Sequence, residues 1–146
     1  MTDAELLREH GLRVTQPRLA VLGALDALPH ADADALHREL VAAGGEISVQ
    51  SVHNVLGDLT AAGLVRRFEP ARSAARYERR IGDNHHHAVC ERCGRVDDVD
   101  CVVGEAPCLH ADAPPGFAVA AAEVTFVGLC ADCVAAGAAA PPVPTA

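Results

Sequence analysis

The sequence predicts an α+β protein with a helical N-terminal half that ends in a basic hairpin, followed by a small β-rich half. Three observations favour this fold class. Four segments with helical hydrophobic spacing come first, each opened by a capping residue. Two short alternating segments follow around a Pro-containing turn. Beyond residue 84 the chain changes to short strands and two C-x-x-C pairs, which predict a metal-stapled second domain.

The expected domain boundaries follow these changes in pattern. We expect a first domain over 1–80, a hinge over 81–84 and a dimerisation and metal-binding domain over 85–137. The last residues, 138–146, contain only Ala, Pro, Val and Thr without periodicity and predict a disordered tail. Each half is small enough to need a staple or a partner for stability, and the modest apolar content of the second half favours pairing with a second copy.

Each expected helix of the first domain begins at a residue that caps helices well. Thr2 with Glu5 forms a capping box, and Thr15, Asp32 and Ser48 are the expected N-caps of the next three helices. Helical spacing places the following side chains on the inward faces of the second to fourth helices: Leu19, Val21, Leu22, Leu25, Leu36, Leu40, Val41, Val52, Val55, Leu56 and Leu59.

The expected strands are short. Residues 64–69 and 75–78 predict a hairpin around a turn at 70–73. In the second domain we expect strands over 88–90, 95–100, 117–122 and 124–128.

Charge is distributed unevenly along the chain. The formal net charge is −8, but residues 81–146 hold nine acidic residues against two Arg, whereas residues 1–80 are nearly balanced. Within 60–80 there are six Arg and two Glu, a local excess of positive charge that can bind phosphate groups. Helices followed by a basic hairpin predict a winged helix-turn-helix whose fourth helix enters a major groove of duplex DNA. The alternative is a small helical domain whose polar stripe is simply solvated.

Four cysteines predict a structural zinc site. Cys90 with Cys93 and Cys130 with Cys133 can present four thiolates in the tetrahedral arrangement of a closed Zn²⁺ site. The alternative is disulfides or redox-active dithiols. Cys101 and Cys108 lie outside the pairs, and we expect small buried thiols there, with redox-active thiols or weak metal ligands as the alternative.

Enzymatic function is not expected. The chain lacks a Ser/His/Asp order, a Gly-rich phosphate loop and an H-E-x-x-H helix. The rival hypotheses are a thiol oxidoreductase or metallohydrolase, and a metal-storage or chaperone protein, which would not require the basic hairpin. No signal-peptide pattern or apolar run of about 20 residues is present, so we expect a cytoplasmic protein without membrane association.

The sequence resembles the ferric uptake regulator family of metal-responsive repressors over nearly all of 5–135. The strings that carry the resemblance are Arg13–Arg18, Pro29–Asp32, Ser48–Val65, Ala75–Glu78, His85–Gly94 and Gly128–Cys133. Two further strings, Gly82–His87 and Asp97–Leu109, look like the actinobacterial branch that controls catalase-peroxidase genes.

The resemblance implies a homodimeric repressor that binds duplex operator DNA and carries a regulatory metal between its domains. The branch resemblance suggests a peroxide-responsive repressor of antioxidant genes; an iron- or nickel-responsive repressor of metal homeostasis genes is the alternative.

The resemblance also implies the ligands of the regulatory metal, which are His30, Glu78, His85, His87 and Asp98. His85 and His87 form an H-x-H motif, and in an extended segment their side chains project to the same side. Imidazole and carboxylate ligands suit Fe²⁺ or Mn²⁺, with Ni²⁺ or Zn²⁺ as alternatives.

The recognition helix departs from the family pattern. Where the family usually has Thr-Val-Tyr, this chain has Ser51-Val52-His53, which changes the expected base contacts but not DNA binding itself. A second metal site found in many members uses a histidine where this chain has Ala122, which leaves His86 and Glu105 as an incomplete set. The residues expected at the DNA are Arg13, Thr15, Arg18, Gln50, Ser51, His53, Asn54, Arg67 and Arg76.

Overall fold

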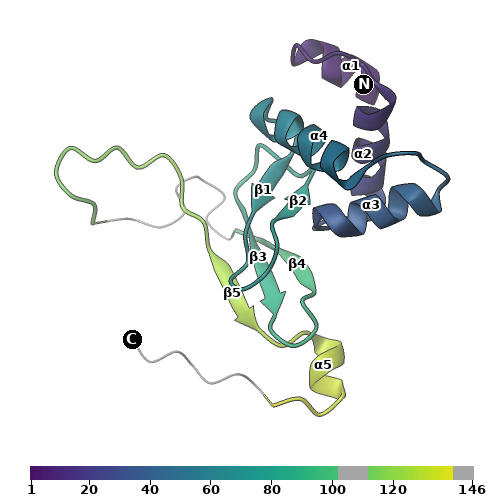
Figure 1. Cartoon of the computed structure of the whole chain (residues 1–146). Coiled ribbons are helices and arrows are strands. Elements are labelled where there is room, and N and C mark those ends of the chain that lie inside the picture. Colours follow the sequence, from purple (N-terminus) through teal and green to yellow (C-terminus); the bar gives the residue numbers. More distant parts are fainter. Residues whose placement is uncertain (102–111, 140–146) are drawn as a thin grey trace. The chain divides into compact units, whose positions relative to one another are not determined.

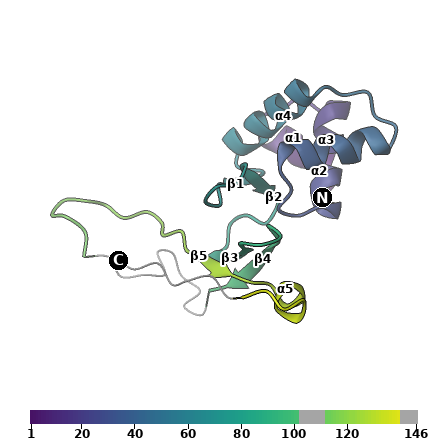
Figure 2. The same cartoon turned by 60° about the horizontal axis from the view of Figure 1, so that its bottom comes forward.

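The computed structural model describes residues 1–101 and 112–139. Within them the chain divides into two compact units, Met1–Ile81 and Gly82–Ala146. Figures 1 and 2 show α1 to α4 gathered in the first unit, and a small sheet with α5 in the second. The first unit contains α1 (Asp3–Glu9), α2 (Gln16–Ala27), α3 (Ala33–Ala42), α4 (Val49–Ala61), β1 (Arg66–Phe68) and β2 (Arg76–Glu78). The second contains β3 (His85–Cys90), β4 (Val96–Asp100), β5 (Thr125–Gly128) and α5 (Ala131–Ala135).

The four predicted caps are confirmed. Thr2 and Glu5 exchange the two hydrogen bonds of a capping box at the start of α1. Each of the next three helices begins after a side chain that accepts a hydrogen bond from a backbone N–H three residues on, at Thr15, Asp32 and Ser48. The start of each helix is therefore set by a hydrogen bond between residues three apart, which can be predicted from the sequence.

The core of the first unit is formed by the inward faces of α1 to α4. The predicted stripe of α4 is buried along its whole length, and it packs against the buried leucines of α2 and α3. Val41 was predicted to lie inward but its side chain is 48% exposed. The buried face of α3 runs through Leu36 and Leu40, four residues apart, and the next residue lies about 100° round the helix. The expectation for Val41 was therefore wrong.

The hairpin that follows α4 is antiparallel, with Arg67 opposite Tyr77. Its strands are shorter than the predicted 64–69 and 75–78. Leu64 and Val65 belong instead to the helical core, where both side chains are 2% exposed. At the predicted turn, Ser73 donates a backbone hydrogen bond of 3.1 Å to the Pro70 carbonyl.

The second unit is built on a three-stranded sheet in which β3 is central. β3 pairs with β4 in antiparallel and with β5 in parallel orientation (Figure 1). The strand predicted at 88–90 begins three residues earlier, at His85, because β4 supplies backbone partners along the whole histidine run.

Two other expectations for the second unit were incomplete or wrong. No strand forms over 117–122. This segment is mostly alanine, which has low strand propensity and little apolar surface to bury, and Phe117 is 66% exposed. A helix that the sequence analysis did not predict, α5, begins directly after Cys130.

Parts of the predicted organisation lie outside the described residues. These include 140–146 of the expected tail, and Glu105 and Cys108. In the described ranges, no helix combines the length and the apolar character that a membrane span needs.

Candidate metal centres and DNA-facing surface

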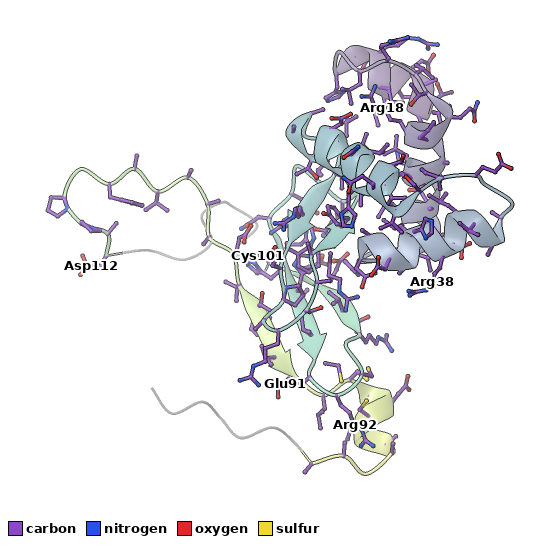
Figure 3. The ribbon with its side chains drawn as sticks, viewed as in Figure 1. Arg18, Arg38, Glu91, Arg92, Cys101 and Asp112 are labelled. Carbon is purple, nitrogen blue, oxygen red and sulfur yellow. The ribbon has the colours of Figure 1, made fainter. Side chains whose placement is uncertain are left out.

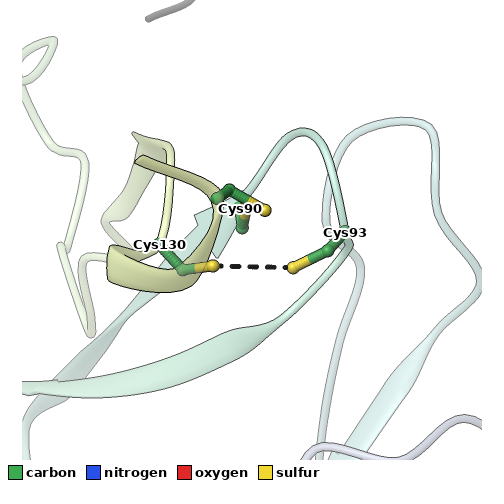
Figure 4. A group of neighbouring side chains, drawn as sticks. Cys90, Cys93 and Cys130 are labelled. Carbon is green, nitrogen blue, oxygen red and sulfur yellow. Dashed lines mark hydrogen bonds between the residues drawn. The ribbon is translucent and has the colours of Figure 1, made fainter. Parts of the chain in front are cut away.

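The four paired cysteines gather at one end of the sheet in the second unit. Cys90 ends β3 and Cys93 lies in the turn that follows it, while Cys130 and Cys133 flank the start of α5. The parallel pairing of β3 with β5 brings the two segments together, since Cys90 lies opposite Gly128. The four Sγ atoms lie within 4.8 Å of one another, and those of Cys93 and Cys130 are 3.7 Å apart (Figure 4).

The electrostatics of this group favour a dication. Hydrogen bonds from the backbone N–H groups of Cys93 and Cys130 lower the pKa of the Cys90 thiol to about 6. A hydrogen bond with the Cys130 side chain, together with burial, raises the pKa of the Cys133 thiol to about 12, because both favour its protonated form. A bound Zn²⁺ would neutralise the charge of four thiolates held this close together, so the donor set fits a structural zinc ion.

A second group in the same unit consists of two histidines and an aspartate. The Nε2 atoms of His85 and His87 lie 3.5 and 3.7 Å from the same oxygen of Asp98, Oδ1. The imidazole rings meet edge to face with centroids 5.0 Å apart. Strand geometry explains this arrangement, because His85 and His87 are two residues apart on β3 and Asp98 lies opposite His87 on β4.

The first unit holds a smaller group made by His30 and Glu78. His30 Nε2 lies 3.1 Å from Glu78 Oε2. The backbone fixes this contact, since His30 donates to the Tyr77 carbonyl at 3.0 Å and Tyr77 donates to the Ala31 carbonyl at 3.0 Å. His30 adopts a positive φ of 66°, and its carbonyl accepts a hydrogen bond of 3.2 Å from Arg76. The predicted regulatory ligands thus form two groups, with three residues in the second unit and two in the first.

Five of the predicted DNA-binding residues, from α4, from α2 and from the segment just before α2, line one hollow of the first unit. Its lining includes Arg13, Thr15, Arg18, Ser51 and Asn54. The remaining α4 candidates, Gln50 and His53, are exposed.

Two of these side chains have partners that the sequence analysis missed. Arg18, labelled in Figure 3, donates to the Asp58 carboxylate at 2.7 Å and to the Arg13 carbonyl at 2.8 Å, which ties α2 to α4. Gln50 donates to the Asn54 side-chain oxygen at 3.0 Å, one helical turn away.

The two predicted arginines of the hairpin differ in their surroundings. Arg67 is exposed and pairs with Glu69 near the turn. Arg76 contacts Ser73 and the His30 carbonyl, so it supports the segment that carries a predicted metal ligand.

Asp83 is a further functional candidate that sequence reasoning missed. Its Oδ1 lies 2.6 Å from Nδ1 of His85. The signal was present in the chain, since a carboxylate two residues before an H-x-H motif can fold back onto the first ring.

Comparisons with known proteins agree with this organisation. A model of the ferric uptake regulator family matches residues 9–123. The chain is 55% identical over 130 residues to the transcriptional regulator FurA of Mycobacterium tuberculosis, across 89% of this chain and 88% of that protein. The structure is similar to the ferric uptake regulator of Pseudomonas aeruginosa with manganese, with a TM-score of 0.66 and 27% identity over 90% of this chain and 99% of that one. It is also similar to the peroxide stress regulator of Campylobacter jejuni, with a TM-score of 0.53 and 30% identity over 68% and 73% of the two chains.

Proposed function

The chain belongs to the ferric uptake regulator family of metal-responsive transcriptional regulators, and on this premise we propose that it is a peroxide-responsive repressor of antioxidant genes, including a catalase-peroxidase gene. Metal dependence is supported by the His and carboxylate side chains that each unit gathers, His30 with Glu78 in the first unit and His85 and His87 with Asp98 in the second. A metal ion bound by ligands from both units would fix one arrangement of the units. If only that arrangement binds DNA well, DNA affinity depends on the metal.

The proposed regulatory ligands are His30 and Glu78 from the first unit and His85, His87 and Asp98 from the second. Three imidazoles and two carboxylates suit Fe²⁺ or Mn²⁺ better than a thiolate set would. The Cys90, Cys93, Cys130 and Cys133 thiols are assigned to structural Zn²⁺.

The DNA-binding surface is proposed to comprise α4 and the β1–β2 hairpin. Support comes from the exposed polar side chains Gln50, His53 and Asn54 on α4, opposite its buried stripe. Their amide and imidazole groups can read base edges, whereas the arginines of the hairpin neutralise phosphates.

The operator-binding form is proposed to be a homodimer. Two apolar side chains of β5, Phe126 and Val127, are 51% and 54% exposed. Among the described strands β5 pairs only with β3, and its other edge is where we place the second copy.

Arg67→Ala tests the placement of the hairpin at DNA. Because Arg67 is exposed at the hairpin, its loss is expected to weaken binding for all sequences alike and to reduce the log–log salt slope by about one unit. Fluorescence anisotropy with duplex DNA at several salt concentrations measures both quantities. Arg38→Ala removes the same charge from an exposed position on α3 and serves as the control. If the two substitutions changed DNA affinity and salt slope equally, the hairpin would not lie at the DNA interface.

Peroxide sensing has a chemical basis in the proposed ligands. Fe²⁺ held by these residues would catalyse the oxidation of a ligand ring by hydrogen peroxide, the two-electron oxidant: one peroxide oxygen would be added to His30 or His85 and the other would leave as water. An oxidised imidazole is a poor ligand, so metal affinity would fall and repression would end. The competing route forms disulfides among the cysteines.

The iron and manganese forms are expected to respond differently to sub-millimolar peroxide. The iron form should lose DNA binding and gain one oxygen atom on a peptide containing His30 or His85, while the manganese form, being harder to oxidise, keeps DNA binding. Mass spectrometry of both forms after the same exposure checks this. Equal loss in the iron, manganese and metal-free forms, with disulfides as the only modification, would contradict the proposal. A repressor of iron- or nickel-homeostasis genes would respond to metal supply and keep its DNA affinity in peroxide.

A further inference from the structure

Asp83 and His85 form a short contact in the turn that leads into β3. Asp83 Oδ1 lies 2.6 Å from His85 Nδ1, a short contact of the kind that an ionised acceptor favours. The preceding residue, Gly82, has a φ of 77°, which a residue with a side chain rarely adopts. The turn therefore folds the carboxylate back toward the ring two residues later.

The other nitrogen of the same ring faces the predicted metal ligands. His85 Nε2 lies 3.5 Å from Asp98 Oδ1, which His87 Nε2 approaches at 3.7 Å. The two nitrogens of His85 thus have different partners, a carboxylate outside the ligand set at Nδ1 and the ligand set at Nε2.

We propose that Asp83 is a positioning residue for the regulatory metal, which holds the proton of His85 on Nδ1 and directs the Nε2 lone pair toward the ion. A neutral imidazole carries one N–H, and the partner of that N–H decides which nitrogen is the ligand. The carboxylate also orients the ring and increases the electron density available to the metal. This inference rests on the proposed function, because it assumes that His85 binds the metal.

The ordinary alternative is that Asp83 only stabilises the turn before β3. The two roles predict different results for two substitutions. Asp83→Asn keeps a hydrogen-bond acceptor of the same shape and loses the charge, whereas Asp83→Ala loses both. A turn-stabilising role would affect folding and zinc content; a positioning role affects the regulatory metal.

The experiment uses full-length, zinc-loaded protein and titrates Mn²⁺ against a competing chelator. Loss of a carboxylate that supports a metal-binding histidine typically costs 10- to 100-fold in metal affinity, so we expect a dissociation constant raised by about that factor for Asp83→Ala and by less for Asp83→Asn. With Co²⁺ as a spectroscopic probe, both variants should shift the d–d absorption bands. DNA binding should reach the wild-type plateau at higher Mn²⁺ concentration, because the ligands themselves remain.

Asp97→Asn is the matched control. It removes the same charge from β4, where Asp97 pairs with Arg95 at 2.8 Å. Two results would overturn the inference if the wild-type protein still binds Mn²⁺. One is wild-type Mn²⁺ affinity and wild-type Co²⁺ spectra for both Asp83 variants. The other is a change in Asp97→Asn as large as that in the Asp83 variants. A wild-type protein that binds no metal beyond zinc would overturn the proposed function and the inference with it.

Discussion

Cys93→Ser is expected to lose the structural zinc and to unfold the second unit or dissociate the proposed dimer. Binding of structural zinc in small domains contributes on the order of 10 kcal/mol, comparable to the whole stability of a small domain. The unit has little to replace it, because the described part of its sheet has three short strands and few fully buried side chains. Zinc analysis, circular dichroism and sedimentation of the purified variant measure the three effects.

Cys101→Ser provides the control for this prediction. Cys101 is a thiol of the same unit outside the four-cysteine group. Its replacement is expected to leave zinc content and association state unchanged. A metal-free Cys93→Ser protein that is folded and dimeric would show that these thiols are not a structural zinc site.

His87→Ala is expected to abolish metal-dependent DNA binding. His87 is one of three ligand candidates that meet in the second unit, and its Nε2 lies near the shared oxygen of Asp98. Removing a residue that only supports a ligand lowers metal affinity about 10- to 100-fold. Removing the ligand itself should therefore lower metal affinity by more than about 100-fold. At metal concentrations that saturate the wild-type protein, the variant should bind DNA no better than the metal-free form.

His10→Ala is the matched control for His87→Ala. His10 is exposed at the end of α1, and its ring contacts only the Leu6 carbonyl among the contacts described for it. The control should keep wild-type metal and DNA affinities. Wild-type metal-dependent DNA binding by His87→Ala, with zinc content unchanged, would show that this histidine is not a regulatory ligand.

The helical half could be predicted almost completely from sequence because its signals are local. Thr15, Asp32 and Ser48 cap helices by contacts three residues away, and the α4 stripe repeats with the helical period. Val41 was the exception among the predicted inward side chains of the helices, because a residue at the edge of an apolar face can lie on either side of the boundary.

The second half was predicted less well because its structure depends on distant pairing. β3 extends to His85 only because β4 lies alongside it, and residues 117–122 stay irregular because their alanines have little apolar surface to bury. In an alanine-rich segment the hydrophobic pattern does not show whether a strand or an irregular segment forms. α5 is short, and its five residues are too few for helical periodicity to be recognised.

The candidate sites show the same division between sequence and structure. Residue types and spacing identified the four cysteines, whose Sγ atoms lie close together in the structure. Partners across the fold could not be found in this way. Arg18 and Asp58 are 40 residues apart in the chain, and only packing of α2 on α4 brings them together.

DNA binding by the wild-type protein is expected to require a regulatory metal, and a titration of duplex DNA measures this requirement. Duplex DNA selected by the protein from a random pool is titrated with zinc-loaded protein alone and with Fe²⁺, Mn²⁺ or Ni²⁺, before and after peroxide. We expect tight binding only with a regulatory metal, and loss of binding after peroxide in the iron form alone. DNA affinity that is the same without regulatory metal and with each of the three ions would contradict the account.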